Sequence, residues 1–186
     1  MRYLMLVIAL FGVRSLTFYL LERQFPHLII PLKEQEPDTP FYTQFTGEII
    51  SGEGASNRIY TEILFDVPES IKPTACKLEF FIDNTSPKWL FGLHDTFAFN
   101  ISTLEGIPNK DFDSWNSHPD VGRWVATFEI DREGHVSKTG GDAPCAVDGP
   151  VGFLMTPSDE SRVGGYTWFE QRYPLHGITL DAGTEN

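Results

Sequence analysis

Residues 59–67 read Ile-Tyr-Thr-Glu-Ile-Leu-Phe-Asp-Val, and this stretch decides the fold class. In an extended chain, Ile63 and Phe65 share one face, whereas Tyr60 and Glu62 point to the other. Alternation with a period of two, in residues that are mostly aromatic or β-branched, is typical of a half-buried strand. The stretch therefore predicts a strand that has one face in a hydrophobic core.

The same alternation recurs in the rest of the chain. It predicts strands at residues 78–82, 97–101 and 124–130, and shorter ones at residues 27–30, 42–50, 151–155, 165–169 and 177–180. It also places Trp124 and Trp168 in the core. The chain shows no convincing helical period after its first residues, and 16 Gly and 13 Pro supply turns. We therefore expect an all-β fold, a single-domain antiparallel β-sandwich of about eight or nine strands with two long loops.

The first residues have the pattern of a secretory leader. Arg2 supplies a positive charge, residues 3–13 are apolar, and Ser15 and Thr17 are small residues suited to cleavage. Arg14 interrupts the apolar stretch, and a single membrane span would bury this charge at a cost of about 2–3 kcal/mol. We expect a signal peptide at residues 1–17, cleavage at about residues 17–25 and no stable membrane span. A retained anchor and a buried native segment are the alternatives.

The net charge limits the classes of partner. The chain carries 14 basic and 26 acidic residues, which gives a formal net charge of −12. Loss of Arg2 and Arg14 with the leader would change this charge to −14. Such a surface repels phosphates, so the charge argues against nucleic acid and against anionic membrane surfaces.

Cys76 and Cys145 are the two cysteines of the chain. Cys76 lies two residues before Leu78 and therefore faces the core side of its strand. A disulfide between the two cysteines would close a loop of about 70 residues and would stabilise the fold by about 4 kcal/mol in the chain-entropy model. We expect this bridge to clamp two β-layers. The alternative is a pair of buried free thiols in a cytosolic protein.

Two sequence motifs predict N-linked glycosylation. Asn100-Ile101-Ser102 is a good acceptor, because Asn100 is predicted to point outward from its strand. Asn84-Thr85-Ser86 is a weaker acceptor, because a proline follows it. Both motifs favour an exported protein.

Two long connections, residues 83–94 and 102–122, interrupt the strands, and binding residues are often found in such loops. An exposed indole of Trp89 or Trp115 would stack on a sugar, with Asp113 and Asn116 as hydrogen-bond partners for its hydroxyl groups. The alternative is that the loops plug an open end of the sandwich with Leu90, Phe91, Phe112 and Trp115.

Catalytic and metal-binding motifs are scarce. The sequence has no Gly-x-Ser-x-Gly motif, and a cysteine nucleophile would have to come from the expected bridge. Residues 111–116 begin like a calcium loop, but Trp115 stands where a third oxygen ligand belongs. The five His show no paired metal-ligand spacing. We expect no catalytic residue, no metal and no cofactor.

A series of motifs resembles a known family. The motifs are, in order, residues 27–31 (HLIIP), 64–68 (LFDVP), 76–80 (CKLEF), 151–155 (VGFLM), 166–171 (YTWFEQ) and 177–180 (GITL). They resemble the fungal family named for the C-terminal domain of a ubiquitin-3-binding protein (the But-type family), over residues 26–180. The resemblance implies small, secreted-looking proteins with a leader, a cysteine pair and no agreed activity. Residues 181–186 would then be a short tail.

These observations favour a secreted, non-catalytic protein of the cell surface, the cell wall or the extracellular matrix. Its partner would be an unknown protein or a cell-wall polysaccharide. Two alternatives stay open. One is a secreted carbohydrate-active enzyme that uses a pair of loop carboxylates. The other is an intracellular interaction domain of the ubiquitin-like modifier pathway.

Overall fold

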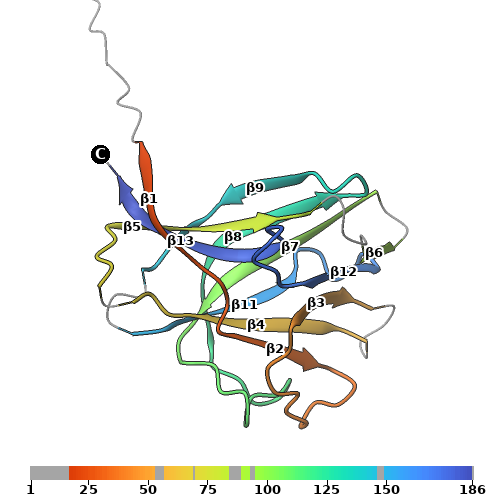
Figure 1. Ribbon diagram of the computed structural model, residues 1–186. Coiled ribbons are helices and arrows are strands. Elements are labelled where there is room, and N and C mark those ends of the chain that lie inside the picture. Colours follow the sequence, from red (N-terminus) through yellow and green to blue (C-terminus); the bar gives the residue numbers. More distant parts are fainter. Residues whose placement is uncertain are drawn as a thin grey trace, which may run out of the picture.

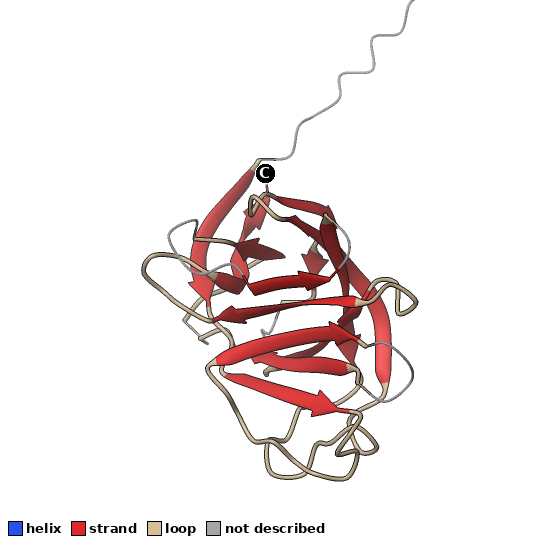
Figure 2. Cartoon of the chain, turned by 90° about the vertical axis from the view of Figure 1, so that its right-hand side faces the viewer, coloured by secondary structure: helices blue, strands red, loops and turns tan. Residues whose placement is uncertain are grey.

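The structure is a computed structural model that describes residues 17–52, 57–68, 70–83, 89–92, 95–145 and 149–185, with the backbone alone at residues 89–92. Regular structure in these residues is entirely β (Figure 1; Figure 2). The strands are β1 (Phe18–Gln24), β2 (Leu28–Lys33), β3 (Thr46–Ser51), β4 (Ile59–Phe65), β5 (Ala75–Phe81), β6 (Trp89–Gly92), β7 (Thr96–Leu104), β8 (Val121–Asp131), β9 (Val136–Gly140), β10 (Asp142–Ala143), β11 (Val151–Pro157), β12 (Gly164–Phe169) and β13 (Gly177–Glu185). Within the described ranges, no helix has the length and hydrophobicity that a membrane crossing requires.

The strands form two antiparallel sheets. The smaller sheet has four strands in the order β1-β13-β5-β10. The larger sheet has nine strands: eight follow the order β6-β12-β3-β4-β11-β7-β8-β9, and β2 pairs with β4. Side chains from both sheets pack into one hydrophobic core. The predicted all-β sandwich is therefore confirmed.

Phe80 of β5 lies at the centre of this core. Its ring centroid is 5.4 Å from that of Phe99, 5.9 Å from that of Tyr166 and 5.5 Å from that of Trp168. Edge-to-face pairs of this kind add about 0.5–1.5 kcal/mol each to the effect of burial. Trp168 is 2% exposed, as the alternation predicts. Gly47 of β3 makes room for its indole, because a Cβ at this position would lie 2.1 Å from the ring.

Each of the nine predicted strands corresponds to a strand of the structure, whereas β1, β6, β9 and β10 were not predicted. Strand β1 lies in the stretch that was expected to contain the leader cleavage site. Strand β13 continues to Glu185, through residues that were expected to form a tail. Residues 1–16, which hold most of the predicted leader, lie outside the described residues.

The first and last described strands pair with each other. Phe18 of β1 lies opposite Glu185 of β13, and the two strands lie side by side in Figure 1. Arg23 donates from Nε and Nη2 to the two carboxylate oxygens of Asp181, at 2.7 and 2.6 Å. Asp181 is only 5% exposed, and a buried carboxylate that loses its cationic partner is strongly destabilising. Strand β1 is therefore an integral part of the smaller sheet.

A β-bulge in β8 reverses the orientation of Trp124. Ile101 of β7 pairs with Ala126, but the next residue, Ser102, pairs with Trp124, so that Val125 is the extra residue. Val125 and Ala126 are both buried, whereas Trp124 is 48% exposed. The prediction that Trp124 lies in the core is wrong, because one inserted residue shifts the side chain beyond it to the other face of the sheet.

Residues 105–120 cover the outer face of the larger sheet near β2, β4 and β11. A second cluster of buried residues lies beneath them, and Trp115 packs against it; its members are Ile30, Leu32, Leu104 and Leu154. Phe112, by contrast, is 72% exposed. The loop therefore covers a sheet face rather than an open end of the sandwich, and the predicted plugging role of Phe112 is wrong. The side chains of Leu90 and Phe91 lie outside the described residues.

Candidate functional site

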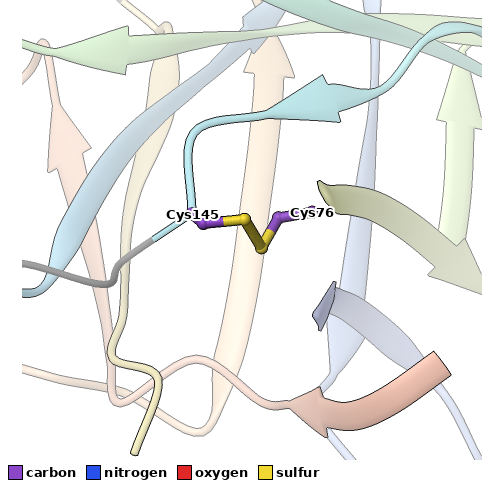
Figure 3. The surroundings of a disulfide bond; sticks show 2 residues. All are labelled: Cys76 and Cys145. Carbon is purple, nitrogen blue, oxygen red and sulfur yellow. A yellow bond between two sulfur atoms is a disulfide. The ribbon is translucent and has the colours of Figure 1, made fainter. Parts of the chain in front are cut away.

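Cys76 and Cys145 form the predicted disulfide (Figure 3). Cys76 lies in β5 and is 3% exposed, as its position relative to Leu78 predicts. Ala143 of β10 pairs with Cys76, and the Cα atoms of the two cysteines are 5.3 Å apart. Because β5 and β10 are neighbours in the smaller sheet, the bridge lies at the edge of one layer. The expectation that it clamps two layers is wrong.

Trp115, the first predicted sugar platform, is half-buried and in contact with two other side chains. Its ring centroid is 4.5 Å from that of Tyr60, and the Arg58 guanidinium carbon lies 5.3 Å from the ring centroid. Arg58 is itself bound to Glu34, with Nη2 2.6 Å from Oε1 and Nε 3.0 Å from Oε2. These contacts occupy the indole. The side chain of Trp89, the second predicted platform, lies outside the described residues.

The two predicted hydrogen-bonding partners of a sugar point in different directions. Asp113 is 7% exposed, and its Oδ2 accepts a hydrogen bond from the backbone N–H of Asn109 at 2.6 Å. Asn116 is exposed, but its Nδ2 donates to Asp38 Oδ1 at 3.0 Å and its backbone N–H donates to Pro37 O at 2.9 Å. These residues hold the covering loop in place, and Asp113 is turned away from solvent.

Asp113 is turned toward Glu62, a buried acid of β4 that the sequence patterns did not single out. Glu62 is fully buried opposite Ile30 of β2 and Leu154 of β11. Neither carboxyl oxygen has a hydrogen bond of normal geometry among the described residues. Burial, and in second place the negative charge of Asp113, raise the pKa of Glu62 to about 9. Glu62 is therefore protonated at neutral pH.

Asn100, the better of the two predicted glycan acceptors, faces outward from β7. The pattern of burial along β7 places Phe99 and Ile101 in the core and leaves Asn100 half-buried on the opposite face. This orientation is the one that the alternation predicts. Its glycosylation remains a prediction, and Asn84 lies outside the described residues.

A small pocket lies beside the end of β12, where three segments of the chain meet. Its volume is about 220 Å³, and it is lined by Pro26, His27, Ile29, Thr43, Gln44, Phe45 and Glu170. The backbone N–H of Gln44 donates to Ile29 O at 2.7 Å, and that of Glu170 donates to Phe45 O at 2.9 Å. Phe45 contributes a ring that is 80% exposed. Because cofactor-sized pockets are larger, at about 300–1,000 Å³, this one suits a single ring or side chain.

Glu170 forms one wall of the pocket and is held in a protonated state. Its Oε2 accepts hydrogen bonds from Trp168 Nε1 and from the backbone N–H of Ile178, both at 3.1 Å. Its Oε1 is buried without a partner in the described part of the chain. Burial raises the pKa of Glu170 to about 8. Gly177 adjoins the carboxyl group with a φ of +108°, and a Cβ at this position would lie 2.3 Å from Oε2.

Three further side chains meet in the turn between β8 and β9. Asp131, Glu133 and His135 each offer one ligand atom, and these atoms lie within 4.8 Å of one another. The Asp131 carboxylate already accepts from the backbone N–H of His135 at 2.8 Å and lies 2.8 Å from its Nδ1. We therefore assign Asp131 and His135 to closing the turn.

The fold and the pocket define a class of protein: this is a disulfide-bonded β-sandwich domain with a small pocket that has the exposed ring of Phe45 at its rim. Within this class, the chain belongs to the family described as Ubiquitin 3 binding protein But2 C-terminal domain, whose family model matches residues 24–174. The resemblance that the sequence motifs indicated is therefore confirmed. The matched range includes both cysteines and every residue that lines the pocket. A search of curated proteins gave no match.

Sequence patterns missed Phe45, Glu62 and Glu170. Phe45 fell inside a predicted strand, but β3 begins only at Thr46. The alternation of the strand therefore does not determine the direction in which the Phe45 ring points. Glu62 occupies a position that the alternation assigns to the exposed face, and a loop distant in sequence buries it. Glu170 carries a weak signal, because it is an acid placed directly after an apolar strand.

Proposed function

We propose that this chain is an exported, non-catalytic binding domain that acts at the cell surface or in the extracellular matrix. The observation that carries the proposal is the Cys76–Cys145 disulfide. Disulfides form and persist in oxidising compartments, whereas the cytosol keeps thiols reduced. A bridge between β5 and Cys145, two residues after the end of β10, fits a protein that leaves the cytosol before it folds.

The N-terminal segment supports export, and the start of β1 favours a specific position for cleavage of the leader. Residues 1–16 hold the apolar stretch and its flanking arginines, and β1 begins directly afterwards, at Phe18. Cleavage near residue 25 would remove β1 and leave Asp181 without Arg23. We therefore place the cleavage at the early end of the expected range, in front of Phe18.

The pocket beside β12 is the proposed binding site. Its exposed Phe45 ring offers an apolar surface, and Thr43 and Gln44 offer polar groups next to it. Of the lining residues, Glu170 is protonated at neutral pH, and His27 Nδ1 lies 2.9 Å from Asp66 Oδ2. A carboxyl group held in its protonated state is neither a nucleophile nor a base. Such a group can still act as a general acid, so the preference for recognition depends on the exposed Phe45 ring and the polar groups beside it.

A second candidate function comes from the family name. The family is described by a protein that binds ubiquitin 3, and this favours a domain that binds a ubiquitin-like protein inside the cell. In that compartment Cys76 and Cys145 would be free thiols. The two candidates thus differ in location, in the N-terminus and in the partner.

The location of the native protein separates the two candidates. The protein should be recovered from the medium or from the cell-wall fraction, and its first residue should lie at or just before Phe18. The cytosolic fraction of the same culture is the control. A chain that keeps Met1 and stays in the cytosol would overturn the proposal of export and favour the second candidate.

Retention assays test the binding site. The purified protein is passed over isolated cell walls and, in parallel, over immobilised ubiquitin. We expect Phe45→Ala to reduce retention on cell walls at least several-fold, because it removes the exposed ring of the pocket. Phe112→Ala is the matched control, since Phe112 is 72% exposed on the covering loop. Equal retention of both variants would remove the pocket from the proposal.

A further inference from the structure

The bulge in β8 brings an exposed indole next to the glycosylation motif of β7. Ser102, the hydroxyl residue of the Asn100-Ile101-Ser102 motif, lies directly opposite Trp124 in the register of the two strands. Asn100 lies opposite Thr127. Trp124 is 48% exposed. Bulges often change the direction of a side chain at a functional site. If β8 lacked this bulge, Trp124 would point into the core.

A chain of hydrogen bonds joins the three side chains on the outer face. Trp124 Nε1 donates to Thr127 Oγ1 at 3.0 Å, and Thr127 Oγ1 donates to Asn100 Oδ1 at 2.6 Å. These bonds fix the carbonyl oxygen of the Asn100 carboxamide. The nitrogen of that carboxamide, Nδ2, is the atom that carries an N-linked sugar, and the hydrogen bond to Oδ1 leaves it available.

The surroundings of Asn100 leave space for a sugar. Its neighbours on the same face have short side chains; they are Ala98, Ser102, Thr127 and Thr156. On the side of β8 that faces β9, the indole lies next to Gly140, where a Cβ would be 2.7 Å from Trp124 Cη2. The absence of a side chain at Gly140 lets the ring rest on the strand.

We propose that Asn100 carries an N-linked glycan and that the indole of Trp124 is the platform on which the first sugar of this glycan rests. The apolar C–H face of a sugar ring fits an aromatic surface, and Trp presents the largest one. The proposal depends on passage through the secretory pathway, and thus on the export proposed above.

The attachment step follows ordinary N-glycosylation chemistry. The co-substrate is a lipid-linked oligosaccharide diphosphate in the secretory lumen. Nδ2 forms a bond to the anomeric carbon and loses one proton, while the bond from that carbon to the lipid diphosphate breaks and the diphosphate leaves. Oδ1 takes no part and continues to accept the hydrogen bond from Thr127 after attachment.

The first test asks whether Asn100 is occupied. The full chain is expressed in a eukaryotic host, once with its own first residues and once with residues 1–16 replaced by a strong secretion leader. Peptide mapping should find the glycan on Asn100, and Ser102→Ala should abolish it. The replaced leader separates the two proposals, because it delivers the chain to the lumen even if natural export fails. An unoccupied Asn100 in that secreted protein would overturn this inference alone.

The second test asks whether Trp124 supports the sugar. Melting temperatures are compared for the wild type, Ser102→Ala, Trp124→Ala and the double variant. We expect loss of the glycan to lower the melting temperature by about 2–4 °C, and Trp124→Ala to remove most of that difference without preventing attachment. Phe112→Ala, the matched control, should leave the difference unchanged. An equal glycan effect with and without Trp124 would overturn the platform role.

Discussion

Replacement of Glu62 by Gln should change the pH dependence of stability in a way that follows from its burial. Glu62 is fully buried on the outer face of β4, beneath the loop that carries Asp113. Burial and the Asp113 charge raise its pKa to about 9, whereas the unfolded chain has the ordinary value of about 4.3. Gln has nearly the same shape and no proton to lose.

The magnitude follows from the two pKa values. Since the folded protein holds the proton more tightly, this group's contribution to stability is fully present below about pH 4 and is lost as the pH rises toward about 9. The slope is about 1.4 kcal/mol per pH unit, so the wild type loses about 3 kcal/mol between about pH 6 and about pH 8 through this group. In Glu62→Gln this loss is absent, and the variant gains relative to the wild type as the pH rises.

The assay is urea unfolding followed by tryptophan fluorescence, at intervals from pH 6 to pH 8. Glu129→Gln is the matched control, because Glu129 is exposed on β8 and should leave the pH dependence unchanged. Parallel stability curves for the wild type and Glu62→Gln would refute the reasoning. They would show that Glu62 is ionised in the folded protein.

Three further perturbations test other parts of the fold by urea unfolding. A chain that starts at Pro26 lacks β1 and leaves the buried Asp181 without its cation, so it should lose about 3–5 kcal/mol; unchanged stability would show that β1 is dispensable. The double variant Cys76→Ser/Cys145→Ser should lose about 4 kcal/mol, because it removes the closure of a long loop, and no loss would mean that the bridge is not formed. Gly177→Ala should lose at least about 2 kcal/mol, because its Cβ collides with the carboxyl group behind the pocket, and a neutral result would contradict that packing.

The strands that could be predicted are those that have one face in the core. Strands β5 and β7 alternate between buried and half-buried residues, and this pattern is visible in the sequence. Strand β9 is almost wholly exposed and β10 has only two residues, so neither contains an alternation to detect. The orientation of Trp124 was predicted wrongly for a different reason. The bulge depends on the pairing with the partner strand, and it cannot be detected in the alternation of apolar and polar residues along the sequence.

The residues of the sites were harder to predict because their surroundings come from distant parts of the chain. Asp113 looked like a solvent-facing ligand, yet the loop folds back and turns it toward Glu62. The pocket combines the β1–β2 connection, the segment before β3 and the end of β12. The cysteine pair was predictable, since the leader-like first residues predict export and two cysteines allow one pairing.

The thiol state of the native protein tests the central claim most directly. Intact cultures are quenched with acid and treated with an alkylating reagent before lysis, and the mass of the protein is then measured with and without prior reduction. We predict that Cys76 and Cys145 take up no reagent unless the protein is first reduced, which is the result of a bridge formed in an oxidising compartment. Two alkyl groups on the unreduced protein would contradict the account.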